Sequence, residues 1–401
     1  MLFPVEILDI ILSFIDDIHS YSNLALSSSI LLRRSRPLHF QSITIKPTNA
    51  NKLSEVLASP YQTILGNIRE IHLVTGQMCL EQHDLLGLIA SSNGQTVRSM
   101  ILDYYLYPDC HAYCYKSFLS EFPNLLSIKI DSGSFPSVTR VMYIICSFRF
   151  LQIACLNNDV GWDLSYDTPD TTALRYNIPS SLRKLTLGYW RKRDILECFM
   201  SCDTLPAISE LDLGMIMPAD AEASGKFLRR LGSSLTSLSL GFYFVDAGGG
   251  AEDFDLICDL SMNTHLQSIT FQRFPALVEP YLVLDIFFDP WPWISKIICS
   301  MRSPDLTTIA FSLPEPNPYA PSTSSYSIKC EWAEIDKFFG QGLPMLPGFK
   351  TLQFRAWQYK PDSDSECDHH ILELACLLAM IQKELLPWCD EIGLLEFMTQ
   401  K

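Results

Sequence analysis

The chain has 401 residues and a formal net charge of −15, and 48% of its residues are hydrophobic against 19% charged. This apolar content excludes a disordered chain and suffices for a large core. Acidic residues outnumber basic ones 45 to 30, which argues against nucleic-acid binding, because duplex binding needs a surplus of Lys and Arg. We therefore expect no nucleic-acid partner, and the charge weakly favours neutral or basic protein partners.

The cysteines and the long apolar stretches indicate the compartment. Thirteen cysteines, an odd number, lie mostly within apolar runs, as buried thiols do in a reducing compartment. No positively charged segment precedes the first apolar run, so no signal peptide is expected. The most apolar long stretch, residues 281–301, contains Asp285, Asp289 and Lys296, so no membrane span is expected. We expect an intracellular protein, cytoplasmic or nuclear.

The first predicted element is a helix over residues 5–18. Its polar residues Glu6, Asp9, Ser13 and Asp16 form one narrow stripe, and every other position except Asp17 is apolar. A helix that is apolar over most of its circumference must be covered on more than one side. Either the neighbouring parts of this chain cover it, or a second protein covers part of it.

A spacing of apolar residues then recurs along the chain: one apolar residue, two variable residues, a second apolar residue, one variable residue and a third apolar residue. Consecutive units start 26 to 31 residues apart at first and about 40 apart in the last third. The twelve units are Phe40/Ile43/Ile45, Ile68/Ile71/Leu73, Val97/Met100/Leu102, Leu125/Ile128/Ile130, Leu151/Ala154/Leu156, Leu182/Leu185/Leu187, Ile208/Leu211/Leu213, Leu235/Leu238/Leu240, Leu266/Ile269/Phe271, Leu306/Ile309/Phe311, Phe349/Leu352/Phe354 and a weaker Cys389/Ile392/Leu394.

Each unit predicts a short strand with one buried face. Its second and third apolar positions are two residues apart and therefore face the same side of a strand, whereas the residues beside them are mostly polar. Amphipathic stretches between the strands predict helices over residues 52–65, 81–92, 137–148, 193–201, 220–231, 252–260 and 331–339. Strand and helix in alternation give a parallel sheet with right-handed crossovers.

The repeat therefore predicts an α/β solenoid with a curved parallel sheet. We expect a short helical domain over residues 1–46 and the solenoid over residues 47–401, because a repeat that cannot bury its own apolar face must stack on its neighbours. The alternative is a doubly wound α/β domain, which would have almost continuously apolar strands and a glycine-rich phosphate loop. Neither feature is present in the sequence.

The units resemble irregular leucine-rich repeats of the strand–helix type. They depart from that pattern after the third apolar position, where the family usually has an asparagine. Gly188, Gly214 and Gly241 stand there instead. We therefore do not expect a ladder of asparagines in these turns.

The segment before the repeats resembles an F-box, in the form seen in basidiomycete fungi. The following stretch, residues 57–73, is similar to the first repeat of those fungal proteins. Two departures are Phe3, where the family usually has Leu, and residues 27–30, which lack the family's Trp. The matching residues are Pro4, Glu6, Ile7, Leu8, Ile11, Leu12, Phe14, Leu24, Ala25, Leu26, Leu38, Phe40 and Ile45.

The resemblance implies a substrate-receptor subunit of an SCF-type ubiquitin ligase. In that role the F-box binds the Skp adaptor, which connects it to a cullin–RING ligase, and the repeats capture a protein substrate. The residues implied to bind the adaptor are Pro4, Leu8, Ile11, Leu12, Ile15, Leu24 and Leu26. An alternative is an interaction scaffold whose diverged F-box no longer engages the adaptor.

Large side chains follow several consecutive strands and suggest where a substrate could bind. Loops after adjacent parallel strands lie side by side, and aromatic residues and Arg are enriched at the centres of interfaces. The candidate substrate-binding residues are Tyr189, Trp190, Phe242, Tyr243, Phe244, Arg273 and Phe274. These side chains either cap the core of the solenoid or form a binding ridge.

The sequence contains no recognisable catalytic or cofactor motif. Phosphate-binding, nucleotide-binding, serine-hydrolase and zinc-protease signatures are absent. Two short groups contain potential metal ligands, residues 110–114 and 367–370, but neither has the second ligand pair of a structural zinc site. The acidic stretch at residues 362–368 lacks the glycine of an EF-hand. We expect no metal, no cofactor and no enzymatic activity; an enzyme would need a pocket of ionisable groups with perturbed pKa values.

Overall fold

The computed structural model divides into two compact units, Met1–Leu182 and Arg183–Lys401, which are treated separately below. The structure describes residues 8, 12, 15, 18–27, 29–62, 64–75, 80–104, 121–135, 138–162, 176–188, 192–243, 251–273, 290–313, 332–340, 346–357 and 381–400. The boundary between the units differs from the domain boundary expected after residue 46, which stays a prediction.

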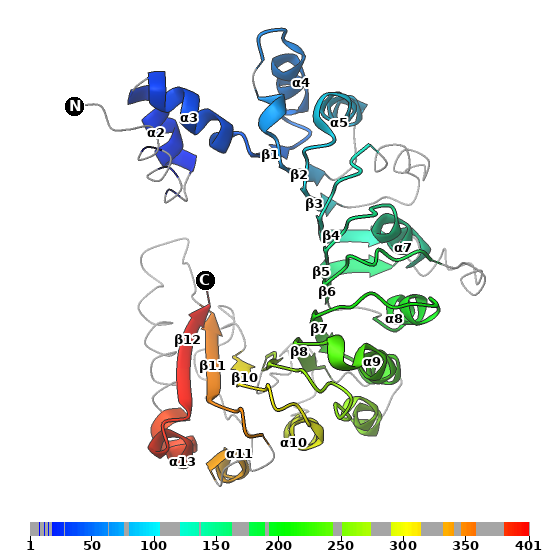
Figure 1. Ribbon diagram of the computed structural model, residues 1–401, viewed down its shortest axis with the longest axis vertical. Coiled ribbons are helices and arrows are strands. Elements are labelled where there is room, and N and C mark those ends of the chain that lie inside the picture. The colour runs from blue at the N-terminus through cyan, green and yellow to red at the C-terminus, as the bar shows by residue number, and fades with distance from the viewer. Residues whose placement is uncertain are drawn as a thin grey trace, which may run out of the picture. The chain divides into compact units, whose positions relative to one another are not determined.

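The first unit begins with two helices and continues as a parallel sheet. Neighbouring strands β1 to β5 pair in chain order, and the helices between them lie along one face of the strands (Figure 1). Its elements are α2 (Ile18–Ser27), α3 (Ser29–His39), β1 (Ser42–Ile45), α4 (Ala50–Ala58), η1 (Leu65–Asn67), β2 (Glu70–Thr75), α5 (Leu80–Asn93), β3 (Ser99–Tyr104), β4 (Ser127–Phe135), α7 (Val138–Cys146) and β5 (Ile153–Trp162).

The second unit repeats this arrangement with strands β6 to β12, again parallel and in chain order. Its helices also lie along one face of the strands (Figure 1). The elements are β6 (Lys184–Leu187), α8 (Lys192–Met200), β7 (Glu210–Ile216), α9 (Pro218–Leu231), η4 (Gly232–Ser234), β8 (Ser237–Phe242), η5 (Ala251–Ile257), β9 (Ser268–Phe271), α10 (Trp291–Ser300), β10 (Thr308–Ser312), α11 (Trp332–Gly340), β11 (Thr351–Trp357), η6 (Ile381–Leu385), α13 (Pro387–Glu391) and β12 (Leu395–Gln400).

For the first eleven units, the structure confirms the strand positions and the buried strand faces that the apolar spacing predicts. In each, the second and third apolar residues lie in the strand and are buried, as in β6, where Leu185 and Leu187 are at most 2% exposed. Pairing aligns equivalent residues, for example Ile269 of β9 with Ile309 of β10. The unbroken strand order and the one-sided helices exclude the doubly wound alternative and establish an α/β solenoid of the leucine-rich-repeat type.

The prediction for the last unit is wrong by three residues. Leu395 of β12, not Ile392, pairs with Leu352 of β11, and Ile392 is 57% exposed. Ile392, Leu395 and Phe397 have the same spacing as the predicted triplet, so the sequence offered two overlapping candidates. Only pairing with β11 separates them.

The helices predicted over residues 81–92, 137–148, 193–201, 220–231 and 331–339 are confirmed, whereas the one predicted over 52–65 ends at Ala58. Most of the helix predicted over residues 5–18 lies outside the described residues. Residues 252–260, expected to be an α-helix, contain the 3₁₀ segment η5 instead. This segment packs closely against α9, where a Cβ atom added to Gly225 would lie 2.0 Å from the Leu256 carbonyl oxygen. The narrower 3₁₀ winding accompanies this close approach of two backbones.

Glycine is required at two of the positions where the family usually has asparagine, because neighbouring repeats approach the backbone closely there. Gly214 has a φ of +54°, and a Cβ atom there would lie 2.9 Å from the Leu187 carbonyl oxygen of the neighbouring repeat. A Cβ atom on Gly241 would lie 2.4 Å from Met215 Sδ and 2.8 Å from the Gln272 carbonyl oxygen. Neighbouring repeats therefore come too close at these turns for a larger residue.

Asparagines do connect neighbouring repeats, but these asparagines precede the strands, whereas the family's asparagine follows them. Asn263, which precedes β9, is 1% exposed, and its Nδ2 donates hydrogen bonds of 3.0 Å to the carbonyl oxygens of Leu228 and Gly232. Asn93, before β3, donates in the same way to the carbonyls of Leu65 and Ile68. These amides satisfy carbonyls at the end of the preceding repeat, where the helical hydrogen-bond pattern stops.

Candidate functional site

The residues implied to bind the adaptor differ widely in exposure. Pro4 and Ile11 lie outside the described residues. Leu8, Ile15 and Leu24 are half-buried, and Leu26 is 88% exposed. Leu12 is only 2% exposed, so its side chain is part of the core and does not present a contact surface. The packing of the unit, not the helical periodicity, decides which apolar positions are covered.

Two further apolar residues are exposed next to Leu26. Ile30 and Leu32, on α3, are 43% and 42% exposed. Leu26, Ile30 and Leu32 are three exposed apolar side chains at the junction of α2 and α3, and they are called the helical patch below. Sequence reasoning did not single out Ile30 or Leu32, because the F-box resemblance places no matching residue there.

The predicted ridge of large post-strand side chains is described only in part. Tyr189, Trp190, Phe244 and Phe274 lie outside the described residues. Phe242 is 2% exposed and packs against Phe254 and Trp293, with ring centroids 5.1 and 6.4 Å away, so it belongs to the core. Tyr243 is half-buried, whereas Arg273 is exposed. For Phe242 the core-capping alternative therefore holds, because the rings from η5 and α10 cover it.

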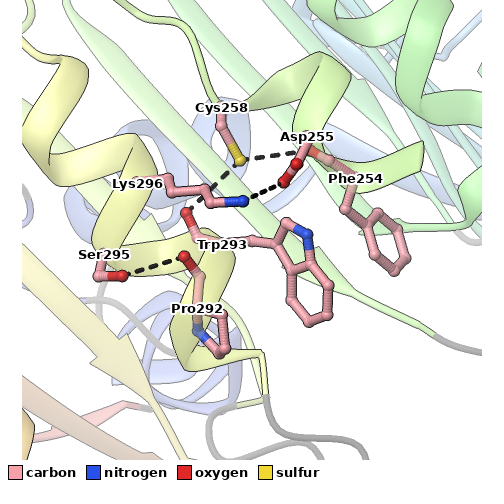
Figure 2. A network of polar contacts seen from close by, with 7 residues as sticks. All are labelled: Phe254, Asp255, Cys258, Pro292, Trp293, Ser295 and Lys296. Carbon is pink, nitrogen blue, oxygen red and sulfur yellow. Dashed lines mark hydrogen bonds and ion pairs between the residues drawn. The ribbon is translucent and has the colours of Figure 1, made fainter. Parts of the chain in front are cut away.

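The cluster around these rings is structural (Figure 2). Lys296 of α10 forms an ion pair with Asp255 of η5 at 2.6 Å. Cys258 Sγ lies 3.3 and 3.6 Å from the carbonyl oxygens of Phe254 and Trp293. Burial raises the pKa of the Cys258 thiol to about 12, so the thiol stays protonated and unreactive near neutral pH. The network therefore connects α10 with η5.

Polar side chains that cross neighbouring strands cover the open face of the second unit, meaning the sheet face opposite the helices. The first such bridge starts at Gln272, directly after β9. Its Nε2 donates to Ser239 Oγ of β8 at 2.6 Å and to Asp212 Oδ1 of β7 at 2.7 Å. The side chain thus crosses β8 beside Gly241, which leaves room for it.

The second bridge starts at Arg355 of β11. Its Nε and Nη2 donate to Gln353 Oε1 at 3.1 and 2.7 Å, and Nη1 approaches Thr270 Oγ1 of β9 at 3.4 Å. Because β10 lies between β9 and β11, the side chain crosses β10 above the small residue Ala310, which is fully buried. Gln353 Nε2 donates in turn to Glu396 of β12 at 2.9 Å. Hydrogen bonds therefore connect β9, β11 and β12 across this face.

A buried lysine lies behind the first bridge. Lys192 of α8 is fully buried, and its Nζ donates to the Met215 carbonyl oxygen at 2.6 Å. Burial lowers its pKa to about 8, against the attraction of Asp220 and Asp212. Burial also raises the pKa of the Asp212 carboxyl, which is opposed by hydrogen bonds from Gly214, Gln272 and Ser239. The charged form of Lys192 is therefore a cost to the folded state at neutral pH.

This cost predicts an unusual pH dependence of stability. Folding lowers the Lys192 pKa from 10.5 to about 8, so between these pH values the unfolded chain binds more protons and the free energy of unfolding rises with pH. The rise is expected to reach about 3 kcal/mol. Urea denaturation at pH 7.5, 9 and 10 measures it. Lys192→Met should lack the rise, and Lys184→Met, at a partly exposed lysine, should retain it. Equal pH profiles for wild type and Lys192→Met would contradict the assignment.

The described part of the chain offers no metal site or membrane helix. Within it, no three His, Cys, Asp or Glu side chains are grouped so as to hold a metal ion, and no helix has the length and apolar character needed to cross a bilayer. The candidate metal-ligand groups at residues 110–114 and 362–370 lie outside the described residues. The chemistry available on the open face is hydrogen bonding and charge pairing.

Comparison with known proteins gives a likeness of fold alone. No model of a known protein family matches the chain, and no curated protein sequence matches it. Among solved structures, the chain is similar to the leucine-rich repeat-containing protein LegL7 from Legionella pneumophila, at 15% identity and a TM-score of 0.43. The match covers 84% of this chain and 97% of that one. The assignment to a leucine-rich-repeat solenoid agrees with it but rests on strand order, register and burial.

Proposed function

We propose that the chain is a substrate-receptor subunit of an SCF-type cullin–RING ubiquitin ligase. In this role the N-terminal helices bind a Skp-type adaptor and the repeats capture a protein substrate. The helical patch carries the proposal, since Leu26 is 88% exposed within the segment that resembles an F-box. The chain itself is proposed to have no catalytic activity and to act in the cytoplasm or the nucleus.

The helical patch is suited to a protein partner. Three large apolar side chains within seven residues, at 42% exposure or more, are costly in water and gain free energy when a partner covers them. Arg33 and Arg34 beside them are also exposed and would form a polar rim. The patch therefore has the composition of an interface core with a charged edge.

The repeats supply the second half of the proposal as a protein-interaction scaffold. Their open face is rich in Ser, Thr and Gln side chains, whose hydrogen-bonding groups can recognise a polypeptide. Within the described residues of the second unit, Asp212, Arg355 and Glu396 take part in polar bridges on this face. These features favour binding over catalysis.

Co-purification of the full chain with a Skp-type adaptor tests the proposal. Leu26→Asp combined with Ile30→Asp is expected to lower adaptor recovery at least about tenfold, because each carboxylate would be buried in an apolar interface. Both sites are exposed, so the fold should tolerate the changes. The matched control is Leu256→Asp with Met262→Asp, which changes two exposed apolar residues of the second unit.

The second candidate function is a scaffold that does not bind the adaptor. It is favoured by the burial of Leu12, which removes one of the implied contacts, and by the missing Trp of residues 27–30. Background-level adaptor recovery with the wild-type chain would support the scaffold and reject the receptor. Equal recovery with the wild type and the patch variant would show that the patch is not the docking site.

A further inference from the structure

We propose that Arg355, on the open face of the second unit, binds an Asp or Glu carboxylate of the protein that the repeats capture. This inference rests on the proposed substrate-capture role, but it does not depend on adaptor binding. It assigns a ligand chemistry to a defined place on the face, where β9, β10 and β11 lie side by side.

The hydrogen bonds of Arg355 leave donors available. Among the described residues, the guanidinium uses three of its five N–H donors, two toward Gln353 Oε1 and one toward Thr270 Oγ1. The bond to Thr270 is long, at 3.4 Å. Each terminal nitrogen therefore keeps one N–H for a ligand, and such a pair of donors matches the two oxygens of a carboxylate.

The acceptors that hold Arg355 are uncharged. Gln353 and Thr270 fix the orientation of the guanidinium without neutralising it. The nearest acid on this face, Glu396, is engaged by Gln353 Nε2 at 2.9 Å, so Gln353 separates the acid from the cation. The arginine is thus held in place by uncharged acceptors, and its positive charge can pair with an anionic ligand.

Partial burial makes such a partner favourable. Burial of the half-exposed Arg355 side chain lowers its pKa, although Glu396 opposes this effect. A guanidinium that has already lost part of its hydration and is already oriented has less to lose when it binds a carboxylate. The neighbouring side chains on β9 and β10, Ser268, Thr270 and Thr308, add hydroxyl groups that can bind the peptide around the acid.

A carboxylate fits this place better than a phosphate. Phosphorylated side chains carry close to two negative charges and are usually bound by clusters of arginines. In the described strands β9, β10 and β11, Arg355 is the one cation. The net charge of −15 also disfavours a dianion more than a single charge.

Selection of peptides on the full chain tests the proposal. A displayed library of random 12-residue peptides is selected on the wild type, and each recovered peptide is synthesised in three forms: with its own Asp or Glu, with Asn or Gln in that place, and with phosphoserine. Fluorescence anisotropy measures the affinities. The wild type is expected to bind the acid form about tenfold or more tightly than the amide form, as a charge-assisted hydrogen-bond pair does.

Arg355→Gln should remove the difference between acid and amide forms, and Arg355→Lys should retain part of it. The matched control Arg229→Gln, at an exposed arginine in the last turn of α9, should retain all of it. Recovery of no peptide above background, an equal preference in Arg355→Gln, or tighter binding of the phosphoserine form would overturn the proposal. Adaptor recovery measured on the same variants stays at the wild-type level if only this inference fails.

Discussion

Replacing Gly225 by alanine is expected to lower the free energy of unfolding of the second unit by about 3 kcal/mol. Gly225 lies inside α9, where alanine would ordinarily stabilise the helix. Here a Cβ atom would lie 2.0 Å from the Leu256 carbonyl oxygen and 2.9 Å from its carbonyl carbon. Both atoms are backbone, so the clash is relieved only if α9 and η5 move apart and loosen the core between them.

Urea denaturation followed by tryptophan fluorescence measures this loss, because six of the seven tryptophans lie in the second unit. The matched control is Gly87→Ala in α5, where no heavy atom lies within 4 Å of the added Cβ. That change should raise stability by about 0.4–1 kcal/mol, as judged by circular dichroism. Equal effects at the two glycines would show that α9 and η5 do not pack as described.

Asp336→Ala is expected to release the end of the second unit. Asp336 of α11 is 6% exposed, and its carboxylate oxygens accept hydrogen bonds from the backbone N–H groups of Trp388 and Cys389 at 3.1 and 3.0 Å. Alanine leaves both donors without this acceptor, at a cost of about 2–3 kcal/mol. Because α13 leads directly into β12, the last strand should open together with the helix.

Hydrogen exchange measured on the peptide covering residues 387–400 reports this opening. A loss of about 2 kcal/mol corresponds to roughly 30-fold faster exchange. Asp336→Asn keeps one acceptor oxygen and should give a smaller increase. Glu384→Ala, at an exposed acid in the preceding segment, serves as the control and should leave the exchange rate unchanged. Unchanged protection in Asp336→Ala would exclude the carboxylate as the anchor of α13.

Repetition made the fold predictable. Eleven strands follow from a spacing that recurs, so an uncertain unit is supported by its neighbours. The errors occur where a unit departs from the repeat. Residues 389–397 fit the spacing in two registers, and only pairing with β11 selects Leu395. Residues 252–260 have an amphipathic pattern but contain a 3₁₀ segment, because the close approach at Gly225 depends on two different repeats.

The candidate sites were far less predictable. Gln272 and Asp212 are 60 residues apart in the chain, and Arg355 and Thr270 are 85 apart. No local sequence motif therefore indicates either of these side-chain bridges between strands. Phe242 shows the opposite error: a large residue after a strand looked available for a partner, yet rings from two other elements bury it. Apolar periodicity identifies a face, but it does not say what covers that face.

The sequence by itself determined the repeat, the facing of the strands and the F-box resemblance, because each depends on residues close together in the chain. Only the tertiary structure decided which side chains meet across strands, that Leu12 is covered while Leu26 is exposed, and that Lys192 is buried beside Asp212 and Asp220. Such contacts depend on the stacking of whole repeats. A side chain that crosses a strand needs a small residue beneath it, and Gly241 and Ala310, which meet this condition, lie 31 and 45 residues before Gln272 and Arg355 in the sequence.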